Sequence, residues 1–176
     1  MKILSLIMKK IIISIVLVAF CIGCDQTTKS YVQTHLPKNT NYSYLGDTFR
    51  LYHTENNGAF LSLGSNWPES VRFWVLTVLP LISLVVIAFV IFMSNRNDWL
   101  TLIAFTLILG GGLSNMWDRI TNDGYVIDFM NMGLGSLRTG IFNFADVFIT
   151  IAFFLIIFDN LREHFFSKKS ETNEAK

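Results

Sequence analysis

Charged residues are scarce in this chain of 176 residues, at 15% of the sequence, where a typical soluble domain has about 25%. Apolar residues make up 52%, and the mean hydropathy is +0.46. This balance excludes a disordered protein, a coiled coil and an ordinary cytosolic enzyme. The net charge of +1 provides no basic surface for nucleic acid, so no nucleic-acid partner is expected. At this length the chain forms one domain at most.

The sequence also lacks the residues that several kinds of active site require. The three histidines, His35, His53 and His164, are scattered along the chain, so no set of zinc ligands is apparent. The only cysteines, Cys21 and Cys24, lie in an apolar run; they fit a packing role better than a redox pair, although both remain open. There is no glycine-rich phosphate loop and no GxSxG nucleophile elbow. We therefore expect neither a metal ion nor a cofactor.

Long apolar runs are what the chain has instead. A helix needs about 20 mostly apolar residues to cross a bilayer. Four segments meet this length: residues 11–32, 72–93, 99–118 and 141–159. The third contains Gly110-Gly111-Gly112, and such small residues permit close packing between membrane helices. The sequence thus predicts an integral membrane protein with four transmembrane helices.

The first span has an alternative interpretation. Lys9 and Lys10 precede an apolar run that ends at Cys21-Ile22-Gly23-Cys24, as in the signal peptide of a lipid-anchored protein that is cut before Cys24. Such a cleavage site normally has leucine where this sequence has Cys21. Three further apolar segments also favour a helix that is not removed.

The distribution of lysine and arginine predicts the orientation. Eight of the 14 basic residues lie in the N-terminal segment, the loop 94–98 and the C-terminal tail. The other six are spread over about twice the length of chain. Both termini are therefore expected in the cytoplasm, with the loops 25–72 and 118–140 outside. Tryptophans near the span ends fit interface anchors: Trp67, Trp74, Trp99 and Trp117.

The outer loops are expected to carry small structured elements. Within the outer loop 33–71, residues 49–54 alternate between apolar and polar, which is typical of a strand, and Asn56-Asn57-Gly58 predicts a turn. The loop 120–140 is expected to carry a short amphipathic segment in the interface. The predicted fold is therefore an all-α integral membrane protein with four transmembrane helices, a small β element and a short amphipathic segment on the outer face. Residues 1–166 form the membrane domain, and 167–176 form a polar, disordered cytoplasmic tail.

Four acids are expected to gather near the outer surface. Asp25, Asp118 and Asp146 lie at outer span ends, and Asp128 lies within the apolar run 126–130. Placing an ionised acid within the membrane costs several kcal/mol of free energy, so a functional role is the first hypothesis for such a residue. Two close carboxyl groups share a proton. The ionised one can then take a proton from water while the protonated one polarises a carbonyl, which is the chemistry of peptide hydrolysis.

Each acid also has a structural alternative. Asp25 precedes Lys29 by four residues, the spacing of an ion pair on one helix face. Asp118 next to Arg119 can form a structural ion pair. Asp146 can lie near the positive end of its helix.

Asp128 and Asp146 fit a catalytic pair best, because each lies in an apolar run without a basic neighbour. Amide and guanidinium side chains suited to holding an extended peptide accompany them: Asn56, Asn115, Arg119 and Asn143. A small proton- or ion-coupled transport or assembly subunit is the alternative function, because the same acids can form a relay.

Five segments resemble the motifs of the lipoprotein signal peptidase family, also called signal peptidase II, and they follow in the family's order. They are Asp25–Lys29, Asn56–Ala59, Gly111–Arg119, Gly124–Phe129 and Phe142–Asp146. The resemblance covers nearly the whole chain. It departs from the family where Phe60-Leu61 follows Ala59, a place at which the family usually has a second alanine.

The resemblance implies the activity and the roles of individual residues. It implies an aspartic endopeptidase of the bacterial inner membrane, multi-pass and monomeric, with its site near the outer leaflet. Its substrate would be a prolipoprotein whose cysteine carries a diacylglyceryl group, cut just before that cysteine among membrane lipids. The implied catalytic pair is Asp128 and Asp146. The implied substrate-binding residues are Asn56, Asn115, Arg119 and Asn143, and the implied supporting residues are Asp25, Lys29, Gly58 and Asp118.

Overall fold

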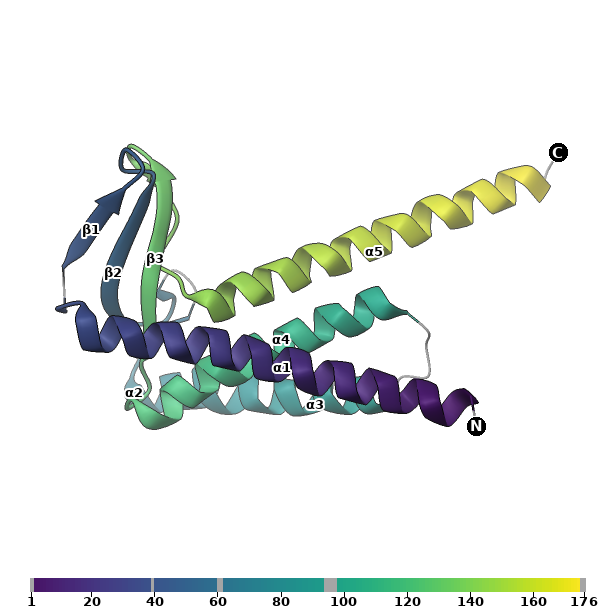
Figure 1. Ribbon diagram of the computed structural model, residues 1–176, viewed down its shortest axis with the longest axis horizontal. Helices are drawn as coiled ribbons and strands as arrows, with labels where there is room; N and C mark the ends of the chain where they lie inside the picture. Colours follow the sequence, from purple (N-terminus) through teal and green to yellow (C-terminus); the bar gives the residue numbers. More distant parts are fainter. Residues whose placement is uncertain (1, 39, 60–61, 94–97, 175–176) are drawn as a thin grey trace.

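Four long helices make up the body of the molecule and carry a small sheet at one end, and the last of them diverges from the other three toward its C-terminal end (Figure 1). The computed structural model describes residues 2–38, 40–59, 62–93 and 98–174. The helical elements are α1 (Lys2–His35), α2 (Glu69–Arg72), the π-helix η2 (Phe73–Val78), α3 (Leu79–Met93), α4 (Trp99–Thr121) and α5 (Phe144–Glu174). The strands are β1 (Asn41–Tyr44), β2 (Phe49–Asn56), β3 (Val126–Leu134) and β4 (Leu137–Arg138). The start of α1 and the end of α5 lie at the end opposite the sheet, which we call the far end.

Four helices have the length and composition to cross a membrane, as the sequence predicts. They are Leu6–His35, Glu69–Met93, Trp99–Thr121 and Phe144–His164. The second contains the π-helical segment η2, just before Pro80; proline lacks the N–H that would continue the regular ladder of hydrogen bonds. The helix α5 continues to Glu174, so residues 167–174 are helical rather than the disordered tail predicted from their polarity.

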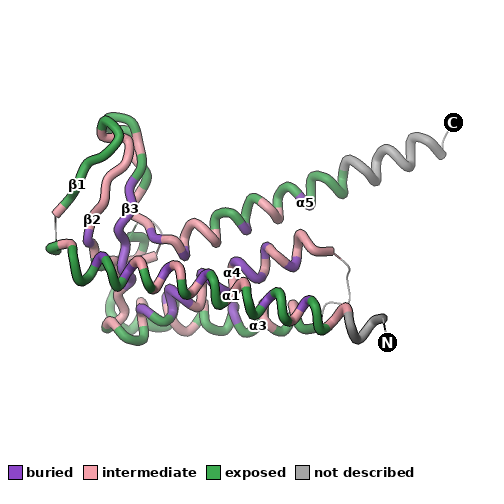
Figure 2. Tube along the Cα trace, viewed as in Figure 1, coloured by how far each residue is buried: buried purple, intermediate pink, exposed green. Residues whose placement is uncertain are grey.

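Helix α4 forms the centre of the bundle and packs against α1, α3 and α5. Its apolar stretch is half buried, against about a fifth or less for the other three, and Figure 2 shows buried positions along it. Its three consecutive glycines face three different neighbours, because successive helical residues point about 100° apart. A Cβ atom on Gly110 would lie 2.7 Å from Cys21 Cβ, one on Gly111 2.6 Å from the Ala145 oxygen, and one on Gly112 2.5 Å from Leu84 Cδ2.

Replacing Gly111 by alanine is expected to lower the free energy of unfolding by about 1–3 kcal/mol, the usual cost of overpacking. The new methyl group would press on the Ala145 carbonyl at the start of α5, which is backbone and cannot rotate away. Reversible unfolding in a detergent titration measures the change. Gly23→Ala is the matched control in α1, where a Cβ has no atom within 4 Å. Equal effects of the two substitutions would contradict this account of the packing.

The sheet joins the two loops at its end of the bundle, in the antiparallel order β1-β2-β3-β4. The predicted strand 49–54 is present as β2, two residues longer. The segment 120–140 was expected to hold a short amphipathic segment; it forms β3 and β4 instead. Its run 126–130 is buried throughout, so it behaves as an inner strand beside β2 rather than as a segment with one wet face. Side chains of β3 pack with Val32 at the end of α1 in a second core: Ile127, Phe129 and Met130.

Candidate active site

The position of Asp146 is set by the start of α5. Phe142 exchanges backbone hydrogen bonds with Met130 on β3, each 2.8 Å, so the helix begins at Phe144 rather than at the predicted residue 141. Asn143 caps it: its Oδ1 accepts from the Asp146 N–H at 3.0 Å, and its own N–H donates to Asp146 Oδ2 at 3.2 Å. This reciprocal pair is a capping box, and it fixes the Asp146 carboxylate.

Asp128 lies on β3 and is 3% exposed. Two amide groups donate to its carboxylate: Asn143 Nδ2 to Oδ1 at 2.7 Å and Asn56 Nδ2 to Oδ2 at 2.9 Å. Asn143 therefore contacts both acids, through its oxygen and backbone N–H on one side and its amide nitrogen on the other. The two predicted catalytic aspartates share this one neighbour.

A buried lysine determines how Asn115 faces Asp146. Lys29 Nζ donates to Asn115 Oδ1 at 2.8 Å, which leaves Asn115 Nδ2 to donate to Asp146 Oδ1 at 3.1 Å. The same ammonium lies 2.6 Å from Asp25 Oδ2 and 2.9 Å from Asp118 Oδ2. Its three N–H groups thus have three partners, and the predicted pairing of Asp25 with Lys29 is present.

The two acids of this ionic cluster also hold the backbone beside the candidate catalytic acids. Asp25 Oδ1 accepts from the N–H of Ala145 at 3.0 Å, one residue before Asp146. Asp118 Oδ2 accepts from the N–H of Ile127 at 3.0 Å, one residue before Asp128. The supporting acids therefore position the two elements that carry the pair.

Two residues of this network were not singled out from the sequence. Gln26 Nε2 donates to Asp118 Oδ1 at 2.7 Å and to Ser114 Oγ at 3.0 Å, and Ser114 Oγ donates to Asp25 Oδ2 at 2.7 Å. The signal for Ser114 was its spacing of four residues before Asp118, which places both on one face of α4.

Arg119 contacts the outer loop rather than Asp118. Its Nη2 donates to the Gly58 oxygen at 2.9 Å, whereas Asp118 pairs with Lys29. The predicted ion pair of Asp118 with Arg119 is therefore wrong, because adjacent helical residues point in different directions. Gly58 has a steric role as well, since a Cβ there would lie 2.6 Å from the Ser62 carbonyl carbon. The departure at Phe60-Leu61 lies outside the described residues.

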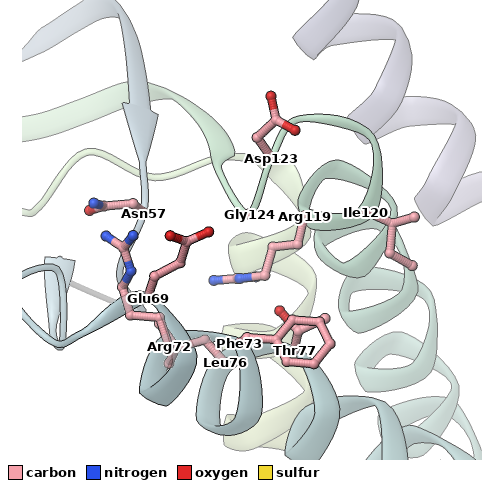
Figure 3. A pocket seen from close by; sticks show the side chains of 10 residues that line it. All are labelled: Asn57, Glu69, Arg72, Phe73, Leu76, Thr77, Arg119, Ile120, Asp123 and Gly124. Carbon is pink, nitrogen blue, oxygen red and sulfur yellow. The ribbon is translucent and has the colours of Figure 1, made fainter.

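The two acids open onto a cleft of about 130 Å³. Its lining comes from β2, β3, α4, α5 and the adjoining loops: Asn56, Gly58, Ala59, Asn115, Arg119, Val126, Asp128, Ile141 and Asp146. A second cavity of about 380 Å³ lies beside it, between α2, η2 and the end of α4 (Figure 3). Arg119 lines both. In Figure 3 Asp123 points away from the other side chains of the second cavity.

Burial, together with the nearby Asp146 carboxylate, raises the pKa of Asp128 to about 7. The amides of Asn56 and Asn143 act in the opposite direction, because they favour the ionised form. A carboxyl group with such a pKa holds a proton in part of the molecules at neutral pH, so the pair can supply one acid and one base. Among the described residues, no three histidine, cysteine or acidic side chains are grouped to hold a metal ion.

Comparisons with known proteins give the family. A family model described as "Signal peptidase (SPase) II" matches residues 17–162. The lipoprotein signal peptidase of Borrelia duttonii is 30% identical over 169 residues, which cover 93% of this chain and 96% of that protein. The lipoprotein signal peptidase of Xanthomonas oryzae pv. oryzae is 32% identical over 138 residues, or 77% of this chain and 80% of that protein.

Solved structures share the fold. One, described as a bacterial membrane enzyme at 2.3 Å resolution, gives a TM-score of 0.75 at 24% identity and covers 86% of this chain and 88% of that one. Another, at 1.9 Å, gives 0.70 at 26% identity and covers 84% and 92%. With its four membrane-length helices, the protein is an inner-membrane peptidase. The chain belongs to the signal peptidase II family.

Proposed function

We propose that this enzyme removes the signal peptide from diacylglyceryl-modified prolipoproteins, cutting just before the lipid-modified cysteine. The relatives named lipoprotein signal peptidase support the substrate class. The observation that carries the chemistry is the contact of Asn143 with both Asp128 and Asp146 in one cleft. We further propose that the enzyme acts as a monomer, with both termini in the cytoplasm and the cleft at the outer leaflet. The lipid tails then stay in the bilayer while water reaches the scissile bond.

The proposed reaction uses one proton shared by the two acids. Ionised Asp146 takes a proton from a water molecule, whose oxygen attacks the carbonyl carbon of the scissile peptide bond. Protonated Asp128 donates to the carbonyl oxygen, and its raised pKa supports this role. The tetrahedral intermediate collapses when a proton passes to the leaving nitrogen and the C–N bond breaks. No covalent link to the enzyme forms.

The polar residues around the pair have two proposed roles. The amides of Asn56, Asn115 and Asn143 each donate to one of the acids, so we propose that they orient the acids as well as the substrate beside them. Arg119 is the proposed anchor for substrate carbonyls. It lines the cleft, and its Nε has no partner among the described residues.

The pH dependence of cleavage tests this mechanism. The rate is expected to fall as the pH rises through about 7, because Asp128 then loses the proton that it donates. Replacing Asn56 by leucine removes a hydrogen bond that favours ionised Asp128 and so raises the pKa of Asp128. The fall in the cleavage rate at alkaline pH is therefore expected to begin at a higher pH than in the wild type. The same loss is expected to lower kcat by about 10- to 100-fold, as for a hydrogen bond to a charged group. Initial rates on a lipid-modified prolipoprotein between about pH 5 and 9 provide the measurement. A wild-type rate that stays flat across pH 7, or a variant whose fall in rate begins at a lower pH, would contradict the assignment.

A proton or ion relay is disfavoured by the spacing of the acids. Between Asp146 and Asp159, α5 has no titratable side chain, and α4 has none between Asp98 and Asp118. A relay needs such groups through the depth of the membrane, whereas these helices carry them only near their ends.

A further inference from the structure

An open groove lies at the far end of the bundle, away from the proposed active site. Its volume is about 790 Å³. It runs between α3, α4 and α5, on the half of the molecule where α5 diverges from the other helices (Figure 1). Its walls are apolar: Phe89, Val90 and Met93 of α3, Phe105 of α4 and Ile156 of α5.

The mouth of this groove is acidic. Among the residues that the structure describes, Asp98, Asp159 and Glu163 line it and no lysine or arginine does. Under the proposed orientation this end faces the cytoplasm, where the sequence has eight of its 14 basic residues but only five of its 13 acids. Three of those five acids therefore gather at one groove, against the overall bias of charge.

Glu163 is the exposed acid of the groove. Asp159 is 6% exposed and has a neighbour at each oxygen: Oδ2 lies 3.0 Å from Thr101 Oγ1, and Oδ1 lies 2.7 Å from Arg162 Nη2. Asp98 accepts from the Thr101 hydroxyl, which holds the pKa of that carboxyl below its usual range.

The other two acids lie beside cations. Arg162 lies against Asp159 on α5, and Lys10 lines a small adjacent cavity with Asp98. Within the part of the chain that the structure describes, Glu163 forms no salt bridge and is exposed, so it is the acid of the groove that is open to a cationic partner.

The distance along α5 from the proposed catalytic pair to the groove matches the length of the apolar segment of a signal peptide. Asp159 follows Asp146 by thirteen residues on α5, which is about 20 Å at 1.5 Å per residue. A signal peptide has a positively charged n-region, then an apolar segment of about 7–15 residues, then the cleavage site. A helical segment of about that length, with its lysines at the acids, brings the cleavage site to the level of Asp128 and Asp146.

We propose that this groove is the docking site for the signal peptide, with the apolar segment against the walls and the n-region lysines at its acidic mouth, against the exposed Glu163. The inference rests on the proposed function. It adds a substrate-binding site, about 20 Å from the catalytic pair along the helix, that measures the length of the apolar segment.

Glu163→Gln is the primary test, because this exposed side chain caps no helix. Steady-state kinetics are compared on two prolipoproteins that differ only in lysine or glutamine at the n-region. The variant is expected to raise KM for the lysine substrate by about two- to fivefold, the range for an exposed ion pair, with kcat unchanged. The glutamine substrate is expected to show no change. Glu163→Asp should retain the wild-type KM, and Glu163→Lys should prefer a substrate with glutamates in the n-region.

A photoreactive residue in the apolar segment of the substrate gives a second readout. After illumination, the cross-link to the substrate is expected at Phe89, Phe105 or Ile156. Unchanged KM values for both substrates with all three variants, or cross-links only at other helix faces, would overturn the docking site and leave a lipid chain as the occupant of the groove. Such a result would not affect the proposed function, which fails separately if the wild-type protein cleaves none of these substrates.

Discussion

Asp128→Asn and Asp146→Asn, made separately, are each expected to lower kcat for prolipoprotein cleavage by about 10³- to 10⁴-fold. General acid and base catalysis contributes about 10²–10⁴ per group, and each acid is required in the same step. Asparagine keeps the size of aspartate and one of its two acceptor oxygens, so one neighbouring donor loses its partner at each site. It can neither hold nor release the proton that the proposed reaction needs. The neighbouring amides remain in place, so the fold is expected to persist.

Asp123→Asn is the matched control for both substitutions. Asp123 is an exposed acid close to the end of α4, with a φ of 52°, a conformation that asparagine adopts as readily as aspartate. Its variant is expected to cleave at the wild-type rate. Near wild-type turnover by either Asp128→Asn or Asp146→Asn would remove that residue from the catalytic pair.

Lys29→Met is expected to lower the free energy of unfolding by about 3–5 kcal/mol, the cost of breaking a buried ion pair from one side. Lys29 is 1% exposed, and Asp25 and Asp118 are 0% and 2% exposed. Removal of the ammonium leaves both carboxylates buried, with no other cation of the described residues within salt-bridge distance. Because these acids also hold the N–H groups of Ala145 and Ile127, the loss reaches both elements that carry the proposed catalytic pair.

Unfolding in a detergent titration measures this effect, with Lys38→Met as the control. Lys38 pairs with Glu55 at the surface, where the two side chains are 62% and 36% exposed, and an exposed pair contributes about 0–1 kcal/mol. Comparable losses in the two variants would show that the buried cluster is not what stabilises this end of the bundle.

The four helices were predictable because the membrane imposes a simple pattern, an apolar run of the right length. The sheet was only half predictable. Residues 49–54 alternate and therefore indicate a strand, whereas the run 126–130 is buried on both faces and has no alternation to detect. Its partner lies about 75 residues earlier in the chain, a pairing that local patterns cannot reveal.

The candidate site was predictable in its members but not in their contacts. The acids stood out because charge is rare in the apolar runs. The amides were assigned to the substrate, yet in the structure each donates to an acid. The orientation of Asn115 depends on Lys29, 86 positions away. Such a dependence arises only when α1, α4 and α5 meet.

The most direct test of the central claim is one turnover of purified enzyme on a diacylglyceryl-modified prolipoprotein in H₂¹⁸O, with mass analysis of both products and of the enzyme. We predict a single cut immediately before the lipid-modified cysteine. One ¹⁸O atom should appear in the new carboxylate of the signal peptide, and the mass of the enzyme should not change. A cut at another bond, a covalent enzyme adduct, or no cleavage would contradict an aspartic pair that activates water at this site.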